Sequence, residues 1–146
     1  MFSLFKKEKL EPVTCNANEF VAPADGRIID ITTVSDAVFA EKMLGESIAF
    51  EFSGNEVTVC APCSGNLTTA FPTGHAFGIT MANGVETLVH IGVNTVGAKG
   101  DGFKMLDKQQ GDDVKAGDPI VKVNLKTLKN SYDMSTMLIV TEPNGL

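Results

Sequence analysis

The stretch "PTGHAFGITMANGVETLVHIGV" (residues 72–93) carries the strongest fold signal in the sequence. At its centre, Asn83 and Gly84 separate two strand-like apolar runs. Asn-Gly is the preferred pair for a two-residue type I′ turn, because both central positions of that turn need a positive φ. The stretch therefore predicts a β-hairpin with strands at residues 75–81 and 85–93.

A two-residue loop also sets which residues face each other across the hairpin. It places Ala82 opposite Val85, Ile79 opposite Leu88, Phe77 opposite His90 and His75 opposite Gly92. Successive side chains point to opposite faces of a strand, so one face would carry His75, Phe77, Ile79, Leu88 and His90. Gly92 would leave room for His75, and diagonal neighbours lie about 7–8 Å apart, a gap that two imidazoles can close. The two histidines of the chain are thus predicted to be neighbours.

The rest of the chain has the same strand character. Short apolar runs end in Gly, Asn, Asp or Pro about every 8–12 residues, which is typical of an antiparallel β-sandwich or barrel. The expected strands are residues 20–21, 27–34, 47–52, 56–60, 66–71, 119–123 and 137–141, besides the two of the hairpin. Short helical turns are expected at residues 36–44, with Asp36 as the cap, and at residues 124–133. The sequence predicts an all-β fold.

An imperfect internal repeat supports this architecture. "VAPADGRII" (residues 21–29) recurs as "CAPCSGNLT" (residues 60–68), with Ala-Pro, two small residues, Gly and then a strand. Proline fixes φ and glycine permits positive φ, so each copy encodes a tight turn between strands. "VKAGDPIVKV" (residues 114–123) adds another turn followed by a strand. A duplicated hairpin motif is expected.

Composition limits the functional classes. A length of 146 residues suits one domain, and a net charge of −6 argues against a nucleic-acid partner, which needs a basic surface. No apolar run approaches the roughly 18 residues of a membrane span, and the N-terminus lacks the apolar core of a secretory signal. Three cysteines, an odd number, suit a reducing compartment. We expect a cytoplasmic protein.

Residues 1–17 differ in character from the rest, and we expect a flexible leader there. Apolar residues interleave with Lys6, Lys7 and Lys9, and Pro12 follows. The alternative is a small basic amphipathic helix that contacts an anionic membrane surface.

The histidine pair allows three kinds of chemistry. Two adjacent imidazoles can be metal ligands, an acid–base couple, or a nucleophile with a partner that stabilises phosphate. A zinc site would combine them with Cys60 and Cys63, but their separation of fifteen positions exceeds the short histidine spacing of finger-type sites. The C-x-x-C sequence of those cysteines is a redox motif when it opens a helix, whereas here it lies in a β-turn. These residues weaken the zinc and redox alternatives but leave the role of the histidine pair open.

Several of these motifs together are similar to one known family. "PTGHAFGI", "GVETLVHIGVNTV", "KGDGF", "VFAEKMLGESIAF" and the two Ala-Pro turns resemble the glucose-type enzyme IIA of the bacterial phosphoenolpyruvate-dependent sugar phosphotransferase system. The similarity runs from about Phe20 to Thr141, within an expected domain of residues 18–146. It implies an antiparallel β-sandwich built on a duplicated motif.

The resemblance also implies a phosphoryl relay. HPr would donate the group to His90, and this protein would pass it to a cysteine on the IIB domain of a sugar permease. His75 would stabilise the phosphoryl group, and Thr73 would orient His75. No metal or other cofactor is implied. We expect the partner-binding residues to be Asp36, Val38, Phe39, Phe71, Phe77, Leu88 and Asn94.

Two departures from the family pattern stand out. Better-known members have an aspartate where this chain has Asn94, so Asp36 would carry more of the contact with HPr. The family also continues beyond the "TEPNG" region through a final strand, and this chain, which stops at Leu146, is expected to lack it.

Two other functions remain open at this point. The same histidine face could serve a regulator that binds other cytoplasmic proteins, because a carrier and a regulator would share His90. A metal-binding module that uses His75 and His90 is the other alternative.

Overall fold

The computed structural model describes residues 19–145, so the expected leader of residues 1–17 lies outside the described residues. The strands are β1 (Gly26–Ile29), β2 (Glu46–Phe52), β3 (Glu56–Cys60), β4 (Gly65–Ala70), β5 (Ala76–Thr80), β6 (Glu86–Ile91), β7 (Phe103–Met105), β8 (Asp113–Val114), β9 (Pro119–Asn124) and β10 (Thr136–Glu142). The helices are η1 (Ile31–Thr33), α1 (Ala37–Ala40), η2 (Thr95–Ala98) and α2 (Leu125–Leu128).

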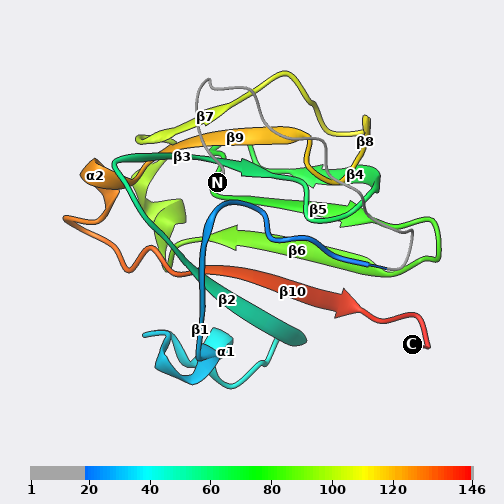
Figure 1. Cartoon of the computed structure of the whole chain (residues 1–146), viewed down its shortest axis with the longest axis horizontal. Coiled ribbons are helices and arrows are strands. Elements are labelled where there is room, and N and C mark those ends of the chain that lie inside the picture. The colour runs from blue at the N-terminus through cyan, green and yellow to red at the C-terminus, as the bar shows by residue number, and fades with distance from the viewer. Residues whose placement is uncertain (1–18, 146) are drawn as a thin grey trace.

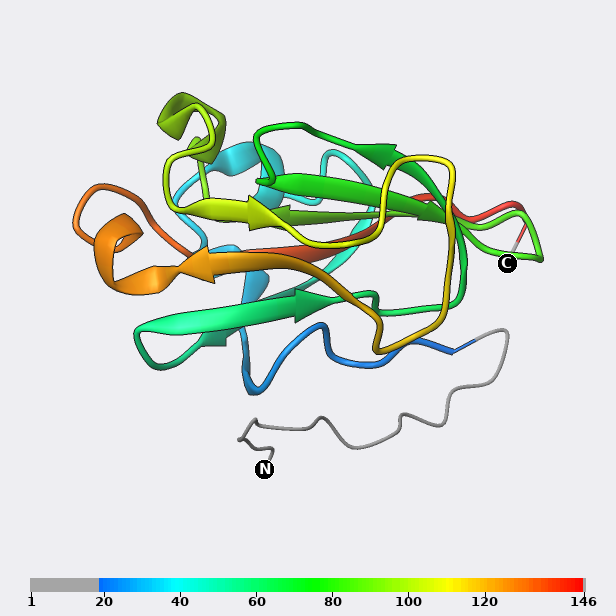
Figure 2. The ribbon, with the colours of Figure 1, turned by 90° about the horizontal axis from the view of Figure 1, so that it is seen from above.

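The strands form two antiparallel sheets, which confirms the predicted all-β sandwich; neither sheet closes into a barrel. The larger sheet has the order β1-β2-β10-β6-β5-β4-β8, and the smaller has the order β3-β9-β7. Figures 1 and 2 show the smaller sheet over one side of the larger one, with α1 beside β1 and β2. Strand β6 lies near the middle of the larger sheet, between β10 and β5.

The two Ala-Pro repeats lie against each other. The backbone N–H of Val21 donates to the carbonyl of Pro62 (2.8 Å), and that of Cys60 donates to Pro23 (2.7 Å). Each repeat then enters a strand, β1 in one case and β4 in the other. This reciprocal pairing is the structural form of the duplication seen in the sequence.

The larger sheet separates two apolar clusters. The main cluster fills the space between the sheets and contains Phe50, Phe77, Ile79, Val89 and Ile91. A smaller cluster covers the other face of the larger sheet, beneath η1 and α1, and contains Val34, Phe39, Ala49, Val93, Met137 and Ile139. Side chains of β6 alternate between the two clusters, so Leu88 and His90 face the smaller one.

The predicted hairpin is present, but its predicted register is wrong by one residue. Ala76 lies opposite His90, and Phe77 lies opposite Val89. The loop has three residues rather than two: Met81 N–H donates to Val85 O (2.8 Å), and Gly84 N–H donates to Met81 O (2.9 Å). Gly84 has a φ of +87°, whereas Asn83 is not among the residues with positive φ. A turn followed by one left-handed glycine replaces the type I′ turn.

The shift in register moves Phe77 and Ile79 to the opposite face from His90. Phe77, which we expected to bind partners, is 1% exposed and belongs to the main core. His75 precedes β5, after the bend at Gly74 (φ +77°), so the strict alternation of the strand does not determine its direction.

The helical turns form where they were expected, although α1 is short. The Asp36 carboxylate accepts a hydrogen bond from Val38 N–H (2.8 Å) and caps its start. The turn ends at Lys42, which has a φ of +56°. There Lys42 N–H donates to Phe39 O and Met43 N–H to Val38 O, a Schellman motif. The expected strand of residues 27–34 ends early, because β1 gives way to η1. Strands β7 and β8 were not predicted.

The position of Phe77 yields a test of the fold. Phe77→Ala should lower the free energy of unfolding by about 3–5 kcal/mol, because it leaves a cavity between the sheets. Phe71→Ala is the matched control: Phe71 is 40% exposed, and its loss should change stability by about 1 kcal/mol or less. Denaturant unfolding measures both. Equal effects in the two variants would contradict the observed register.

Candidate functional site

His90 lies on β6 with one ring nitrogen fixed by the backbone. Its Nδ1 is 2.7 Å from the carbonyl oxygen of Gly92. A carbonyl oxygen only accepts, so His90 Nδ1 carries the hydrogen and the lone pair of the neutral ring is at Nε2. The hydrogen bond thus leaves Nε2 of His90 as the ring nitrogen with the lone pair.

Gly92 is required for this arrangement. Its φ is +78°, and a Cβ there would come within 2.5 Å of Thr95 Cγ2 and 2.9 Å of Met134 Sδ. Gly92 N–H also donates to Ser135 O on the neighbouring segment (3.0 Å). The expected role of Gly92, to leave room for His75, was wrong: the glycine makes room for Thr95 and Met134.

His75 lies beside His90, as predicted. Their ring centroids are 5.4 Å apart, with the planes at 77°. Thr73 Oγ1 is 2.6 Å from His75 Nδ1, so a donating hydroxyl would leave the hydrogen of the neutral ring on Nε2. His75 can then donate from Nε2 to a group bound at His90.

Aromatic rings flank both histidines. The Phe39 ring on α1 is 4.9 Å from the His90 ring, centroid to centroid. The Phe71 ring is 5.0 Å from the His75 ring, edge to face. His75 is only 3% exposed, while His90 is half-buried. Each histidine therefore has a phenyl ring beside it.

Burial lowers the pKa of both histidines. For His75, burial is the main cause, and the nearby His90 adds to it. For His90, burial again dominates, and it outweighs the Gly92 hydrogen bond and the Asp36 charge, which raise the pKa. Both rings are therefore neutral at pH 7, the state in which Nε2 of His90 can attack an electrophile.

The expected partner-binding residues divide into three groups. Val38 (37% exposed), Phe71 (40% exposed), half-buried Asp36 and exposed Asn94 are at the surface. Phe39 (7% exposed) and half-buried Leu88 belong to the small cluster beneath α1, where Phe39 supports the His90 ring. Phe77 lies on the other face of the sheet and cannot reach a partner. Asn94 adopts the left-handed conformation at the start of η2, with φ 61°.

Cys60 and Cys63 have no features of a redox pair. Cys60 ends β3, and burial, followed by the charges of Asp118 and Asp25, raises its pKa to about 11. Cys63 is fully buried, with its Sγ 3.8 Å from Thr87 Oγ1. Among residues 19–145, no three side chains of His, Cys, Asp or Glu are grouped closely enough to hold a metal ion.

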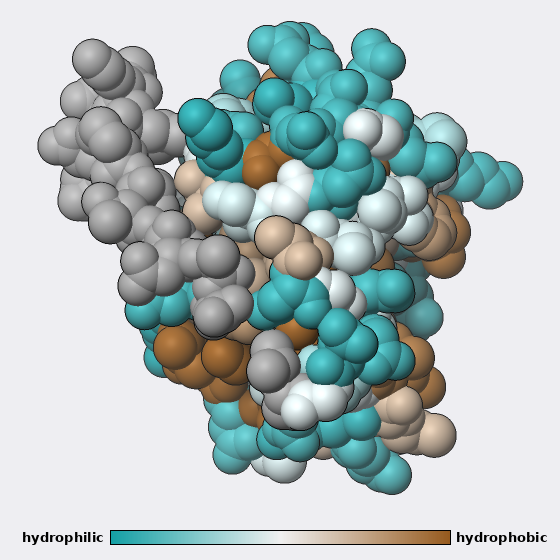
Figure 3. All heavy atoms as spheres, turned by 90° about the vertical axis from the view of Figure 1, so that its right-hand side faces the viewer, coloured by the Kyte–Doolittle hydropathy of each residue, from teal (hydrophilic) through white to brown (hydrophobic). Residues whose placement is uncertain are grey.

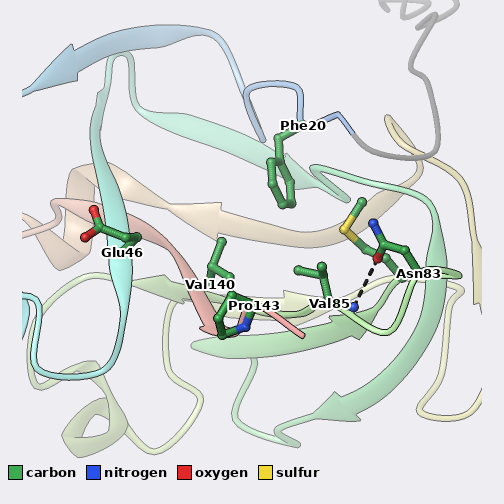
Figure 4. A pocket seen from close by; sticks show the side chains of 7 residues that line it. Phe20, Glu46, Asn83, Val85, Val140 and Pro143 are labelled. Carbon is green, nitrogen blue, oxygen red and sulfur yellow. Dashed lines mark hydrogen bonds between the residues drawn. The ribbon is translucent and has the colours of Figure 1, made fainter. Parts of the chain in front are cut away.

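A separate apolar pocket lies at the other end of the hairpin. It has a volume of about 250 Å³ and is lined by Phe20, Glu46, Met81, Asn83, Val85, Val140 and Pro143. Figure 4 shows Phe20, Val85, Val140 and Pro143 converging on it. Figure 3 shows the corresponding end of the molecule, where hydrophobic residues form small patches among hydrophilic ones. The hairpin turn lies here, whereas His90 is near the opposite end of β6.

Comparison with known proteins identifies the family of the chain. Residues 18–145 match the family model described as phosphoenolpyruvate-dependent sugar phosphotransferase system, EIIA 1. The chain belongs to this family. Membership makes the protein a phosphocarrier component of sugar transport, of the glucose-type EIIA group.

Individual relatives cover most of the chain. A glucose-specific EIIA component of Mycoplasma capricolum subsp. capricolum is 44% identical over 86% of this chain and 79% of its own length. One from Halalkalibacterium halodurans is 38% identical over 100% of this chain and 83% of its own length. A glucose-specific EIICBA component of Staphylococcus carnosus is 39% identical over 95% of this chain, which corresponds to 20% of that longer protein.

A solved structure shares the fold. Glucose permease IIA from Mycoplasma capricolum superimposes with a TM-score of 0.79 at 44% identity, covering 87% of this chain and 81% of that one. The helices of this EIIA protein within residues 19–145 are all too short to cross a membrane.

The lowered pKa values can be measured directly. Titration of the imidazole C–H resonances by NMR should give midpoints for His75 and His90 below about 6.5, the value for an exposed histidine. Unfolding in denaturant should return both midpoints to that value. A His90 midpoint at or above about 6.5 in the folded protein would show that the Gly92 hydrogen bond and the Asp36 charge outweigh burial.

Proposed function

We propose that this EIIA protein accepts a phosphoryl group from phospho-HPr on His90 and passes it to the IIB domain of a sugar permease. Residues 18–146 would form the phosphocarrier domain, and the exchange would take place in the cytoplasm. The observation that carries the proposal is the neutral His90, with Nδ1 held by Gly92 and the second histidine ring 5.4 Å away.

The first half-reaction would use the lone pair on Nε2 of His90. That pair attacks phosphorus in line, the bond from phosphorus to the donor group on HPr breaks, and its electrons leave with the donor. The hydrogen stays on Nδ1, where it is donated to the Gly92 carbonyl throughout the reaction. The ring therefore needs no proton transfer before it attacks. In such loose transition states, positioning and charge stabilisation supply most of the catalysis.

His75 would act on the phosphoryl oxygens rather than on phosphorus. With Nδ1 accepting from the Thr73 hydroxyl, its Nε2–H is available as a donor. A donor already in place costs no reorganisation when charge develops on the oxygens. In the second half-reaction, the IIB cysteine attacks phosphorus and the N–P electron pair returns to His90.

The exposed residues around the two histidines would form the docking surface. Val38 and Phe71 offer apolar area beside the histidines, and Asp36 offers a negative charge. The carboxylate also accepts the Val38 N–H and is therefore held in one orientation. Asn94 contributes no charge, so Asp36 supplies the electrostatic attraction to a basic partner.

Replacing each histidine separately tests the assignment. His90→Gln should accept no phosphate at any donor concentration, because glutamine has no basic ring nitrogen. His75→Gln should still accept phosphate from HPr but pass it to IIB on the order of 10²–10³ times more slowly. Labelled phosphoenolpyruvate with enzyme I and HPr measures acceptance, by mass under alkaline conditions, and added IIB measures onward transfer. Normal labelling of His90→Gln would overturn the proposal.

The cysteines provide the control. Replacing Cys60 and Cys63 together with alanine should leave the rate of phosphate acceptance unchanged, because the raised pKa of Cys60 keeps its thiol protonated. Circular dichroism should first confirm that the double variant is folded. A folded double variant that no longer accepts phosphate would assign a direct role to the thiols.

A further inference from the structure

Asp133 joins segments that are far apart in the sequence. It lies between α2 and β10, and its Oδ1 accepts hydrogen bonds from Ser135 N–H (2.9 Å) and Ser135 Oγ–H (2.7 Å). Its Oδ2 accepts the backbone N–H of Ser35 (3.3 Å), 98 positions away in the chain. Its backbone carbonyl accepts the N–H of Val93 (2.8 Å). One residue therefore connects the segment before α1 to the end of β6.

Both connected segments belong to the candidate site. Ser35 immediately precedes Asp36, the cap of α1, and α1 carries Val38 at the surface and Phe39 against the His90 ring. Val93 immediately follows Gly92, whose carbonyl fixes Nδ1 of His90. The side chain of Asp133 reaches the first segment, and its backbone reaches the second.

The carboxylate is suited to this contact. Partial burial raises the pKa of Asp133, but the hydrogen bonds from Ser135 and Ser35 outweigh burial and hold the pKa below its ordinary value. The group is therefore ionised at neutral pH. An ionised carboxylate makes stronger hydrogen bonds to N–H donors than a neutral acceptor does.

The contact with Ser35 restrains a short element. α1 is a single turn, and isolated helices of that length are unstable in water. Packing of Phe39 and Val34 on the small cluster holds it from below. The hydrogen bond from Ser35 N–H to Asp133 holds the residue just before the cap of α1 close to the end of β6.

We propose that Asp133 is a positioning residue for phosphoryl transfer: its carboxylate holds the segment before α1 so that Asp36 and Val38 meet the donor beside His90. This inference rests on the proposed function of His90. Because the backbone carbonyls of Asp133 and Ser135 hold Val93 and Gly92, respectively, loss of the Asp133 carboxylate alters docking and leaves the nucleophile in place.

Asp133→Asn separates an effect on docking from an effect on the nucleophile. Oδ1 of Asp133 accepts both Ser135 bonds, and Oδ2 accepts the Ser35 N–H. Asparagine that keeps its oxygen at the Oδ1 position turns its NH2 group towards Ser35 N–H, so the Ser35 bond is lost. The KM for phospho-HPr should rise on the order of fivefold or more, while kcat stays unchanged. ¹⁵N NMR should still show the hydrogen of His90 on Nδ1.

Two further variants control for a general loss of structure. Ser135→Ala removes the Oγ–H bond to Asp133 but keeps the Ser35 bond, so its KM should stay near that of the original protein. Ser35→Pro removes the N–H donor and leaves Asp133 intact. The preceding Val34 is already extended (φ −67°, ψ 137°), as a residue before proline should be. The Ser35→Pro variant should raise KM as Asp133→Asn does. It replaces Asp133→Asn in the test if asparagine prevents folding.

The outcomes distinguish the two proposals. If the unaltered protein accepts no phosphate, the proposed function fails. The imidazole resonances of His90, which the Phe39 ring affects at 4.9 Å, then still report the position of α1. Shifts in Asp133→Asn and Ser35→Pro, but not in Ser135→Ala, support the positioning role. An unchanged KM with unchanged resonances, or a fall in kcat of the same size as the rise in KM, overturns it.

Discussion

The hydrogen bond from His90 Nδ1 to the Gly92 carbonyl determines what this site can do. It leaves the lone pair on Nε2, and in this tautomer the neutral ring can accept a phosphoryl group on Nε2 without first losing a proton. The bond depends on a left-handed glycine, whose backbone is in turn held by Ser135. Burial then keeps the ring uncharged. The remainder of the fold brings a second histidine, an aromatic ring and exposed apolar side chains close to this one nitrogen.

Much of the architecture follows from local sequence patterns. Alternating apolar residues, Asn-Gly and the repeated Ala-Pro turn predicted the sandwich, the hairpin and the duplication, because these signals act over a few residues. The register of the hairpin was wrong because Asn83-Gly84 suits both a two-residue loop and a three-residue loop with one left-handed glycine. That difference of one residue changed the face of Phe77. His75 was still predicted correctly as a neighbour of His90, although through a bend before β5 rather than through the predicted register.

The parts of the site that the sequence did not reveal involve distant segments. No local pattern connects Ser35 with Asp133, or indicates that the Gly92 carbonyl accepts from His90. The left-handed φ of Gly92 depends on Thr95 and Met134, which meet only in the folded sheet. Short strands such as β7 and β8 also escaped prediction, since they form by pairing with β9 and β4 and have little pattern of their own.

The division of the apolar residues into two clusters has an evolutionary consequence. The larger sheet lies between the cluster beneath α1 and the interior of the sandwich. Substitutions in Val34 or Phe39 therefore alter the cover over the histidines without contacting the side chains that join the two sheets. Under the proposed function, substitutions in this outer layer would alter the surface that donors and acceptors meet, while selection for folding acts on the other side of the sheet.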